Sequence, residues 1–462
     1  MPAIFRTTAD LSLLRGPLLI NGVLVTTIQL DETHDPARKS WVESANKPDC
    51  DFPIQNLPFG VFRTNGQGNA RIGVAIGDVI LALGAIASQL DGQIDNACDL
   101  LQADSLRPLM AQSPTVWTAL RKALGRMLES GSASRSICEP HLVPIAQAEM
   151  LMPVRPGGFV DFYASIQHAT NAGSLFRPTA PLLPNYKHIP IGYNGRASTI
   201  RIGGGEIRRP NGQRKAADKD MPDFGPSQRL DYEMEIGIFL GNSTQIGSPV
   251  TITDAWQHIF GFCILNDWSA RDIQAWEYQP LGPFLGKSFA TSISPWIVTA
   301  DALRPFHAAA FDRAAGDPKP MPYLFDEHDQ KNGAVDIEIE TWFRSGRMSA
   351  SGQSPIRLSA ASAAKLYWTP AQMVTHQTSN GCNIEAGDLY GTGTVSGETR
   401  DSLGSLLEIT RGGGEPLTLP DGSTRTFLDD GDEITMKARC RRDGFVTIGF
   451  GRCSGRVVGA PT

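Results

Sequence analysis

The sequence predicts a mostly β (α+β) protein in which a small N-terminal domain precedes a much larger one. Three observations lead to this fold class. Short apolar runs recur between Gly, Pro and Asp in the C-terminal two thirds, which is the pattern of successive strands. Long helical stripes are few there. The segment MLMPVRPGG at 150–158 contains two prolines and two glycines, which interrupt both periodicities and place a domain boundary near residue 150.

Residues 1–40 show little in their sequence that would attach them to the domain that follows, and they end in the charged stretch DETHDPARK. We expect them to form an N-terminal extension. It is either a disordered arm or the product of an upstream translation start, and an arm with a function is the alternative. The apolar stretch Leu18 to Val25 is too short to span a bilayer and lacks the flanks of a secretory signal.

Residues 41–150 form the predicted N-terminal β domain. In ARIGVAIGDVILAL, two strand-like runs flank Gly77 and Asp78, and a two-residue Gly-X loop suits the twist of a hairpin. The segment SPTVWTALRKALGRMLESG at 113–131 predicts a helix that Ser113 caps and Gly131 terminates. Its helically spaced apolar residues are expected in the core: Val116, Leu120, Leu124 and Met127.

Residues 151–462 form the predicted catalytic domain. Gly, Pro and Asp separate its strand-like runs, and no period of 20 to 50 residues recurs, so repeat architectures are excluded. The runs are DYEMEIGIFLG, SPWIVTA, VDIEIETWF, DEITMKARC and GFVTIGFGRC.

Composition bounds the partners and the compartment. The 462 residues are 41% hydrophobic and 19% charged, which is ordinary for a soluble globular protein. A net charge of −6 disfavours binding to a phosphate backbone, so nucleic acid is not an expected partner. Seven scattered cysteines without a CxxC pair suit a reducing compartment, and we expect a cytoplasmic protein without a membrane partner.

The densest chemical motif is DFYASIQHATN at 161–171. It places a carboxylate, a phenol and an imidazole, those of Asp161, Tyr163 and His168, within eight residues. Carboxylate oxygens are the ligands that Mg²⁺ or Ca²⁺ prefers, and an imidazole is the usual general base near neutral pH. A lone histidine is more often a structural hydrogen-bonding group, so the motif by itself only suggests a metal-assisted enzyme.

Two glutamates follow in DYEMEIGIFLG. Glu233 and Glu235 lie at i and i+2, so on a strand they project from the same face and repel each other unless a cation lies between them. Such a pair is most often a solvated face of an edge strand. Here the apolar run Ile236 to Leu240 follows directly, which favours an interior strand and a metal site.

A third motif, NDWSARDIQAWEYQPLGPFLGKSF, begins where an apolar run ends. Asp267 offers a further metal oxygen, and Arg271, Gln274 and Tyr278 would share one face of a helix, where they could hold a carboxylate or enolate. A surface helix with ordinary polar residues is the alternative. GPFLGKS is one residue short of a phosphate loop and no dinucleotide fingerprint is present, so no nucleotide cofactor is expected.

The nucleophile is expected to be water. The sequence contains no HExxH, no GxSxG and no cysteines at metal-ligand spacing, so zinc proteases and serine hydrolases are not supported. A distant carboxylate such as Glu408 in GSLLEIT could fix the tautomer of His168, although spacing cannot show this contact.

These motifs together resemble the fumarylacetoacetase family. The likeness runs from SWVESANKPDCDFPIQNLPFGVF to the C-terminus, and its most specific strings include DFYASIQHATN, LPNYKHIPIGYNGRAS, NDWSARDIQAWEYQPLGPFLGKSF and GTGTVSG. The resemblance implies a small Src-homology-3-like barrel followed by a large mixed β-roll, a homodimer, and Mg²⁺ and/or Ca²⁺. The implied reaction hydrolyses a carbon–carbon bond of a diketo acid, 4-fumarylacetoacetate, to fumarate and acetoacetate, the last step of tyrosine and phenylalanine catabolism.

The resemblance also implies roles for residues of this sequence. The general base is His168 with Glu408 as its orienting acid. The expected metal site comprises Asp161, Glu233, Glu235, Asp267, Lys287 and Thr291. The expected substrate contacts are Tyr163, Arg177, Tyr193, Arg271, Gln274, Tyr278 and Thr394. An ammonium group cannot ligate a cation, so Lys287 would contribute its backbone carbonyl or would stabilise an enolate instead.

Two alternatives remain at this level. One is a related acylpyruvate hydrolase, decarboxylase or isomerase of the same superfamily, against which the N-terminal domain and His168 argue. The other is a catalytically silent metal-binding or scaffold protein, which would have no need for His168 and Glu408 together.

Overall fold

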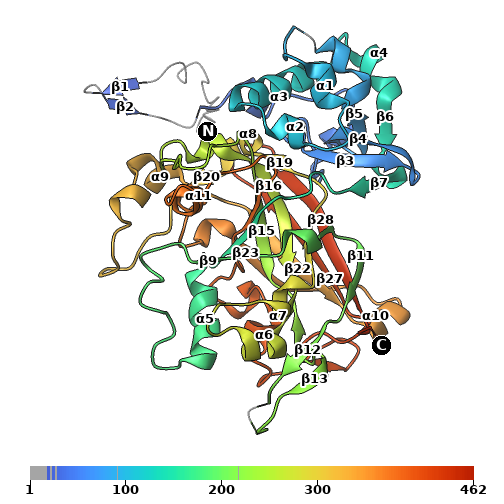
Figure 1. Cartoon of the computed structure of the whole chain (residues 1–462). Helices are drawn as coiled ribbons and strands as arrows, with labels where there is room; N and C mark the ends of the chain where they lie inside the picture. Colours follow the sequence, from blue (N-terminus) through green and yellow to red (C-terminus); the bar gives the residue numbers. More distant parts are fainter. Residues whose placement is uncertain (1–17, 21–22, 26–28, 91, 217, 462) are drawn as a thin grey trace, which may run out of the picture.

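The computed structural model describes residues 18–20, 23–25, 29–90, 92–216 and 218–461. A small domain lies above a larger one in Figure 1, and strands dominate both. The predicted α+β class with a large, strand-rich C-terminal domain is therefore confirmed.

The small domain is a curled five-stranded sheet. Its edge strands β6 and β7 are joined by only the three residues Ile145–Gln147, so the sheet must curl until its edges approach each other, as in a small barrel. The hairpin predicted at Gly77 and Asp78 is confirmed, because Ile76 pairs with Val79. The strand order is β6 (Leu142–Pro144), β5 (Val79–Ala82), β4 (Gln67–Ile76), β3 (Phe59–Thr64) and β7 (Ala148–Leu151).

Helices cover this sheet, and the longest is the one predicted. It begins at Pro114 after an extended Ser113, but it ends at Leu128, before the predicted stop at Gly131. The chain turns extended at Glu129 because that residue bridges to Ser40. The helices are α1 (Ala97–Leu101), α2 (Arg107–Met110), α3 (Pro114–Leu128) and α4 (Arg135–Cys138).

The segment before this domain is only partly an extension. Residues 1–17, 21–22 and 26–28 lie outside the described residues, so the extension prediction has no structural account there. Residues 31–40, in contrast, pack against the protein: His34 is buried with Nε2 2.7 Å from the carbonyl oxygen of Asp301, and Arg38 is paired with Glu129. A disordered arm ending at residue 40 is therefore wrong for this part. We propose a small domain that begins near residue 31 and a larger one that begins near residue 151.

The larger domain contains two main sheets. The first has the order β10-β18-β16-β15-β24-β8-β9, with β19 beside β16, and the second has the order β11-β28-β27-β22-β23. In the first sheet the strands are β8 (Phe159–Phe162), β9 (Gly192–Asn194), β10 (Ile200–Ile202), β15 (Met234–Leu240), β16 (Ile259–Asp267), β18 (Thr291–Ile293), β19 (Val298–Thr299) and β24 (Leu389–Gly391). In the second they are β11 (Gly205–Arg208), β22 (Glu338–Arg344), β23 (Ile356–Ser362), β27 (Glu433–Cys440) and β28 (Ile448–Val458).

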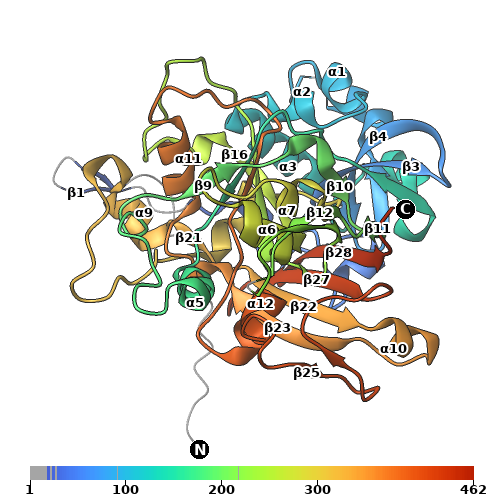
Figure 2. The same ribbon diagram turned by 60° about the horizontal axis from the view of Figure 1, so that its bottom comes forward.

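The two sheets pack face to face. Strand β16 contacts both β27 and β28, and one core cluster joins side chains of both sheets. Alternate residues of β22 and β27 are buried, as expected for strands with one face in the core, whereas every residue of β15 and β16 is buried. Figure 2 shows β22, β23 and β27 side by side along the lower face. Strand β15 is thus interior, as its apolar sequence predicted.

The remaining elements are short. The helices are α5 (Ile166–Phe176), α6 (Arg271–Glu277), α7 (Leu285–Ser288), α8 (Ala300–Leu303), α9 (Glu327–Asn332), α10 (Gly346–Ala350), α11 (Pro370–Thr378) and α12 (Leu406–Ile409). The two-stranded pairs are β1 (Leu18–Ile20) with β2 (Val23–Val25), β12 (Asn211–Arg214) with β13 (Asp223–Pro226), β14 (Leu230–Asp231) with β17 (Ser269–Ala270), β20 (His307–Ala308) with β21 (Ala334–Val335), and β25 (Leu417–Thr418) with β26 (Thr424–Arg425).

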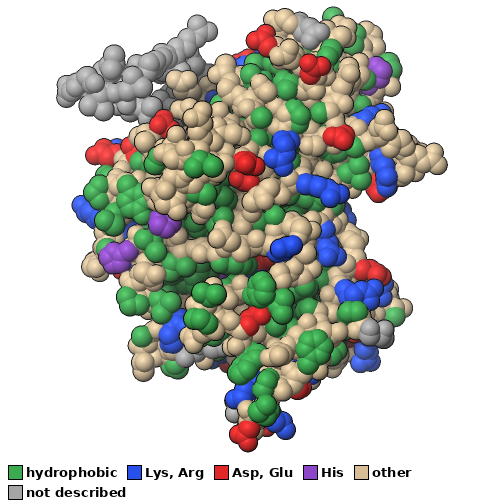
Figure 3. Space-filling model, in the orientation of Figure 1, with side chains coloured by type: hydrophobic (Ala, Val, Ile, Leu, Met, Phe, Trp, Pro, Cys, Tyr) green, Lys and Arg blue, Asp and Glu red, His purple; other side chains and the backbone are tan. Residues whose placement is uncertain are grey.

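The surface is mixed in character. On the face drawn in Figure 3, acidic and basic side chains are interspersed among hydrophobic ones. Among the described residues, no helix has both the length and the apolar composition needed to cross a bilayer.

Candidate metal centre and active site

Four buried carboxylates converge in the first sheet of the larger domain. Asp161 lies on β8, Glu235 on β15, Glu233 just before β15, and Asp267 at the end of β16. One oxygen from each lies within 4.8 Å of the others. The convergence follows from the strand order, because only β24 separates β8 from β15, and β15 pairs with β16. We call this group the carboxylate cluster.

A glycine makes room for the carboxylate cluster. Gly391 on β24 pairs with Asp161 of β8, and a Cβ atom at this position would lie 2.5 Å from Asp161 Oδ1 and 2.9 Å from Glu235 Oε2. A side chain here would have to displace these carboxylate oxygens, and both residues are buried, so the space into which they could move is small.

We expect Gly391→Ala to lower the affinity for a divalent cation at least tenfold, because a misplaced ligand commonly costs this much. Titration of the metal-depleted variant by calorimetry measures the affinity. Gly205→Ala is the matched control, because a Cβ atom there would meet nothing within 4 Å. An unchanged affinity in Gly391→Ala would show that this close approach does not shape the cluster.

The carboxylate cluster holds more negative charge than its surroundings balance. Burial, and then the charge of Asp267, raises the pKa of Asp161 well above its ordinary value. Burial and the charges of Asp161 and Glu233 do the same for the pKa of Glu235. Both shifts report that the anionic forms of these two carboxyl groups lack compensation.

Two cations compensate the other side of the cluster. The ammonium group of Lys287 donates to Glu233 Oε2 and, at 2.8 Å, to Asp267 Oδ2, and Arg271 Nη1 donates to Glu233 Oε1 at 2.6 Å. Burial would raise the pKa of Glu233, but the charges of Lys287 and Arg271 outweigh it and lower that pKa. Glu233 is therefore anionic, and the uncompensated charge lies toward Asp161 and Glu235.

The donor set fits a hard divalent cation. Asp161 Oδ1 and Glu235 Oε1 are buried, and neither has a hydrogen-bond partner among the described residues. Buried carboxylate oxygens are rarely left in this state, and a cation satisfies both the lone pairs and the charge. This cluster is therefore where a metal could bind.

His168 and Glu408 form a buried pair beside this cluster. The Nδ1 atom of His168 lies 2.7 Å from Glu408 Oε2, and both residues are at least 95% buried. Each residue is the third of a helix whose N-cap serine, Ser165 or Ser405, accepts a hydrogen bond from its backbone N–H. Capping thus fixes both side chains at the start of rigid turns.

Glu408 is held as an anion. Its Oε2 atom also accepts from the hydroxyls of Ser396 and Ser405, each at 2.9 Å, and its Oε1 atom accepts from Asn171 Nδ2 at 2.9 Å. Burial would raise the pKa of Glu408, but His168 and these donors lower it below its ordinary value. With Nδ1 donating to this anion, Nε2 of His168 carries the free lone pair.

The lone pair of Nε2 lies next to the carboxylate cluster. Nε2 is 4.0 Å from Glu233 Oε1, and the ring of Tyr163 packs edge-on against the imidazole with ring centroids 5.4 Å apart. The arrangement can therefore accept a proton within a few ångströms of a bound cation and of any ligand on it.

Tyr193 and Gln274 contact groups of the same centre, and Tyr278 lies at the end of the helix that carries Arg271. Tyr193 donates to Asp267 Oδ2 at 3.0 Å, Gln274 accepts from Arg271 Nη1 at 3.4 Å, and Tyr278 is the C-cap of helix α6 that carries both Arg271 and Gln274. Arg271 and Gln274 thus contact each other on α6, as their spacing predicts, and a place for Tyr278 on the same face stays a prediction.

Two further predicted contacts have buried polar atoms without a hydrogen-bond partner among the described residues. These atoms are Arg177 Nε and Thr394 Oγ1. They are free to bind a ligand, whereas Arg177 Nη2 is already used by the carbonyl oxygen of Pro181.

Lys287 and Thr291 both contact members of the carboxylate cluster. The ammonium group of Lys287 binds two carboxylates, and the hydroxyl of Thr291 donates to Asp267 Oδ1 at 2.7 Å. A side chain that donates to a ligand orients it and balances its charge. The alternative that Lys287 acts through its charge is thus the one that its contacts support.

Sequence reasoning missed several residues of the site. Asn171 and Ser396 bind Glu408, and Asp231 binds Arg271. One signal was available: Ser405 and Glu408 form the S-x-x-E pattern that marks a helix N-terminus. Nothing in the sequence indicated the contact of Asn171 or Asp231, because both partners are distant in the chain.

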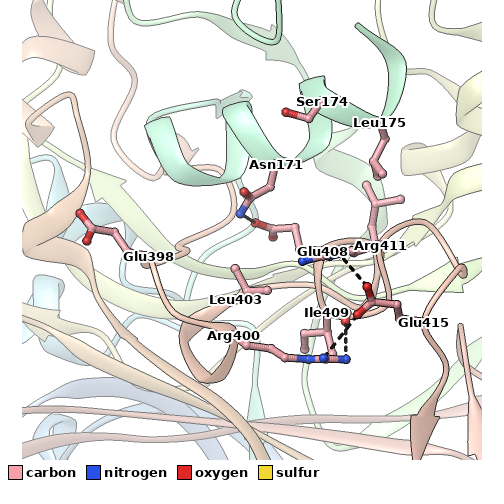
Figure 4. A pocket seen from close by; sticks show the side chains of 11 residues that line it. Asn171, Ser174, Leu175, Glu398, Arg400, Leu403, Glu408, Ile409, Arg411 and Glu415 are labelled. Carbon is pink, nitrogen blue, oxygen red and sulfur yellow. Dashed lines mark hydrogen bonds and ion pairs between the residues drawn. The ribbon is translucent and has the colours of Figure 1, made fainter. Parts of the chain in front are cut away.

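Glu408 also lines a cavity of about 320 Å³. Figure 4 shows Asn171 and Glu408 facing each other, and Glu415 joined to both Arg400 and Arg411 by ion pairs. The cavity does not include any residue of the carboxylate cluster.

Comparison with known proteins covers nearly the whole chain. Residues 55–153 match the family model "Fumarylacetoacetase N-terminal", and residues 158–458 match "Fumarylacetoacetate (FAA) hydrolase C-terminal". The fumarylacetoacetase of Arabidopsis thaliana is 43% identical over 430 residues, which are 92% of this chain and 99% of that protein. Those of Oryza sativa subsp. japonica and Homo sapiens are each 42% identical, over 91% and 89% of this chain and 97% of each relative.

Proposed function

Because the chain belongs to the fumarylacetoacetase family, we propose that the pair of His168 and Glu408 is its general base and that the carboxylate cluster binds its metal ion. The enzyme hydrolyses the carbon–carbon bond of 4-fumarylacetoacetate to fumarate and acetoacetate, the last step of tyrosine and phenylalanine catabolism. The observation that carries the residue roles is the 2.7 Å contact between His168 and Glu408, with Nε2 of His168 beside Glu233.

The proposed metal is Mg²⁺ or Ca²⁺. The family is metal-dependent, and the cluster offers only carboxylate oxygens, which are the ligands of these hard cations. The carboxylate cluster contains no cysteine sulfur and no histidine nitrogen. When bound, the ion supplies Lewis-acid polarisation of the diketo oxygens of the substrate. Asp161 and Glu235 contribute the oxygens that have no other partner among the described residues.

His168 begins the reaction as a base. Its Nε2 atom removes a proton from water, and the water oxygen attacks the carbonyl carbon of the fumaryl group, which becomes the new carboxyl carbon of fumarate. Glu408 accepts from Nδ1–H throughout, which holds the tautomer and stabilises the imidazolium that forms. The tetrahedral intermediate then collapses, and the electrons of the broken carbon–carbon bond leave with acetoacetate as an enolate.

The enolate needs positive charge and a proton. Arg271 and Lys287 are buried cations at the edge of the cluster, and the charges of the neighbouring carboxylates outweigh burial and raise the pKa of each above its ordinary value. Both therefore remain charged where negative charge develops. The imidazolium of His168 returns the proton to the enolate carbon, which completes the balance.

The substrate contacts are proposed on the same basis. Tyr163, Tyr193, Arg177, Gln274, Tyr278 and Thr394 offer more donors than a small keto acid can use. This surplus favours a long diketo acid over the substrates of the related decarboxylases, isomerases and acylpyruvate hydrolases. A silent scaffold is disfavoured because it gains nothing from a buried His168 and Glu408 pair.

We expect purified protein with Mg²⁺ to cleave fumarylacetoacetate much faster than it releases CO₂ from oxaloacetate. Chromatography identifies fumarate and acetoacetate as products, and the two reactions are compared at equal enzyme and metal concentration. Faster decarboxylation of oxaloacetate would favour the alternative activity.

We also propose a homodimer, as the resemblance implies, and a cytoplasmic location, as the scattered cysteines suggest. Light scattering of the purified protein measures its mass, and a monomeric mass at micromolar concentration would contradict the dimer.

A further inference from the structure

Asp231 lies outside the carboxylate cluster, is fully buried, and binds two parts of the site at once. It ends β14, and no part of it is exposed to solvent. Its two oxygens accept four N–H donors. Oδ1 accepts from Tyr232 N and Leu406 N, each at 2.8 Å, and Oδ2 accepts from Leu407 N at 2.9 Å and Arg271 Nε at 3.0 Å.

Two of these donors belong to helix α12. Leu406 and Leu407 are its first and second residues, and Glu408 is the third. A carboxylate on the first N–H groups of a helix satisfies donors that have no partner within the helix. Asp231 therefore holds the turn that carries Glu408, the partner of His168.

The fourth donor belongs to the guanidinium group of Arg271. With Nε fixed by Asp231 and Nη1 by Glu233, the plane of this group is determined at two points. The remaining nitrogen, Nη2, is buried and has no hydrogen-bond partner among the described residues. A cationic N–H in this state is available to a ligand that carries negative charge.

We propose that Asp231 is a positioning residue for the hydrolysis, holding the helix of Glu408 and the guanidinium of Arg271 in fixed relation to each other. The proposal rests on the proposed function of His168 and Glu408. In the sequence Asp231 lies two residues before Glu233, but the four hydrogen bonds of its side chain go to Tyr232, Leu406, Leu407 and Arg271 and not to His168 or the carboxylate cluster. Its effect on turnover must pass through Glu408 and Arg271.

The test is Asp231→Asn, which keeps the size of the side chain. An amide nitrogen cannot accept, so at least one of the four donors would face another donor. We expect kcat to fall by about tenfold or more, within the range of couplings between residues of one network, at unchanged metal content. In the Glu408→Gln and Arg271→Ala backgrounds, the same substitution should lower kcat by a clearly smaller factor.

Asp432→Asn is the matched control. Asp432 is also fully buried, and it accepts from the guanidinium of Arg425 at 2.8 and 3.1 Å and from Asp429 N at 2.8 Å. The control should lower the melting temperature as Asp231→Asn does but leave kcat unchanged. Equal effects of the two substitutions on kcat, or full additivity of Asp231→Asn with Glu408→Gln, would show that Asp231 is only structural.

A second test changes a donor to Asp231 and leaves Asp231 itself unchanged. Leu406→Pro deletes the N–H that binds Asp231 Oδ1 at the first helix position, where proline is tolerated, and Leu406→Ala deletes the side chain but keeps the N–H. If Asp231→Asn does not fold, the proposal requires a lower kcat in Leu406→Pro than in Leu406→Ala. Equal values would overturn it. If Glu408→Gln itself leaves kcat unchanged, the proposed function fails instead.

Discussion

The His168→Ala enzyme is expected to turn over fumarylacetoacetate about 10²- to 10⁴-fold more slowly than the wild type, the usual cost of losing a general base. The metal should stay bound, because Nε2 of His168 is 4.0 Å from Glu233 Oε1 and is not one of the four oxygen donors. Steady-state kinetics gives kcat, and metal analysis of the same samples gives the occupancy.

The fold should also survive this substitution, which circular dichroism and a melting curve check. Replacing His188, a histidine outside the described site, by alanine is the matched control and should leave kcat unchanged. Near-normal kcat in His168→Ala would place the base elsewhere and make this histidine structural. A parallel loss of metal would assign it to the metal site instead.

Removing the divalent cation is expected to abolish turnover, and adding Mg²⁺ should restore it. Without the cation, the buried oxygens of Asp161 and Glu235 have neither partner nor counter-charge, and the enolate lacks the polarisation that the ion supplies. The measurement is kcat after dialysis against a chelator and after stepwise restoration of Mg²⁺ or Ca²⁺. Full turnover in protein shown to be free of metal would contradict the assignment.

A single substitution separates binding from folding. Glu233→Gln should weaken the affinity for the metal. The melting temperature should stay close to that of the wild type, because the amide keeps the shape of the side chain. Glu340→Gln on β22, outside the cluster, is the control and should change neither quantity. Unchanged affinity in Glu233→Gln would remove Glu233 from the ligand set.

Sequence patterns predicted those parts of the molecule that depend on near neighbours. The hairpin at Gly77 and Asp78 follows from local turn chemistry, and the start of α3 follows from a proline at its first position. Both are present, although the side chain of Ser113 makes no capping hydrogen bond. The end of α3 was missed because a bridge from Glu129 to Ser40, a residue far away in the chain, stops the helix. Distant pairing of this kind leaves no local signal.

The residues of the site also fall into those that the local sequence predicted and those that it could not predict. Alternation along one strand placed Glu233 and Glu235 together, but their meeting with Asp161 and Asp267 depends on the order of strands in the sheet. The resemblance supplied that missing geometry for the four carboxylates. It did not indicate Asp231, whose four hydrogen bonds join segments that are separated by up to 176 residues.

A double-mutant cycle on kcat tests whether His168 and Glu408 act as one base. His168→Ala, Glu408→Gln and the double variant are measured with equal metal content. If the carboxylate acts only through the imidazole, its loss costs little once the imidazole is gone. We therefore expect the double variant to be little slower than His168→Ala alone. Two losses that multiply independently would contradict it.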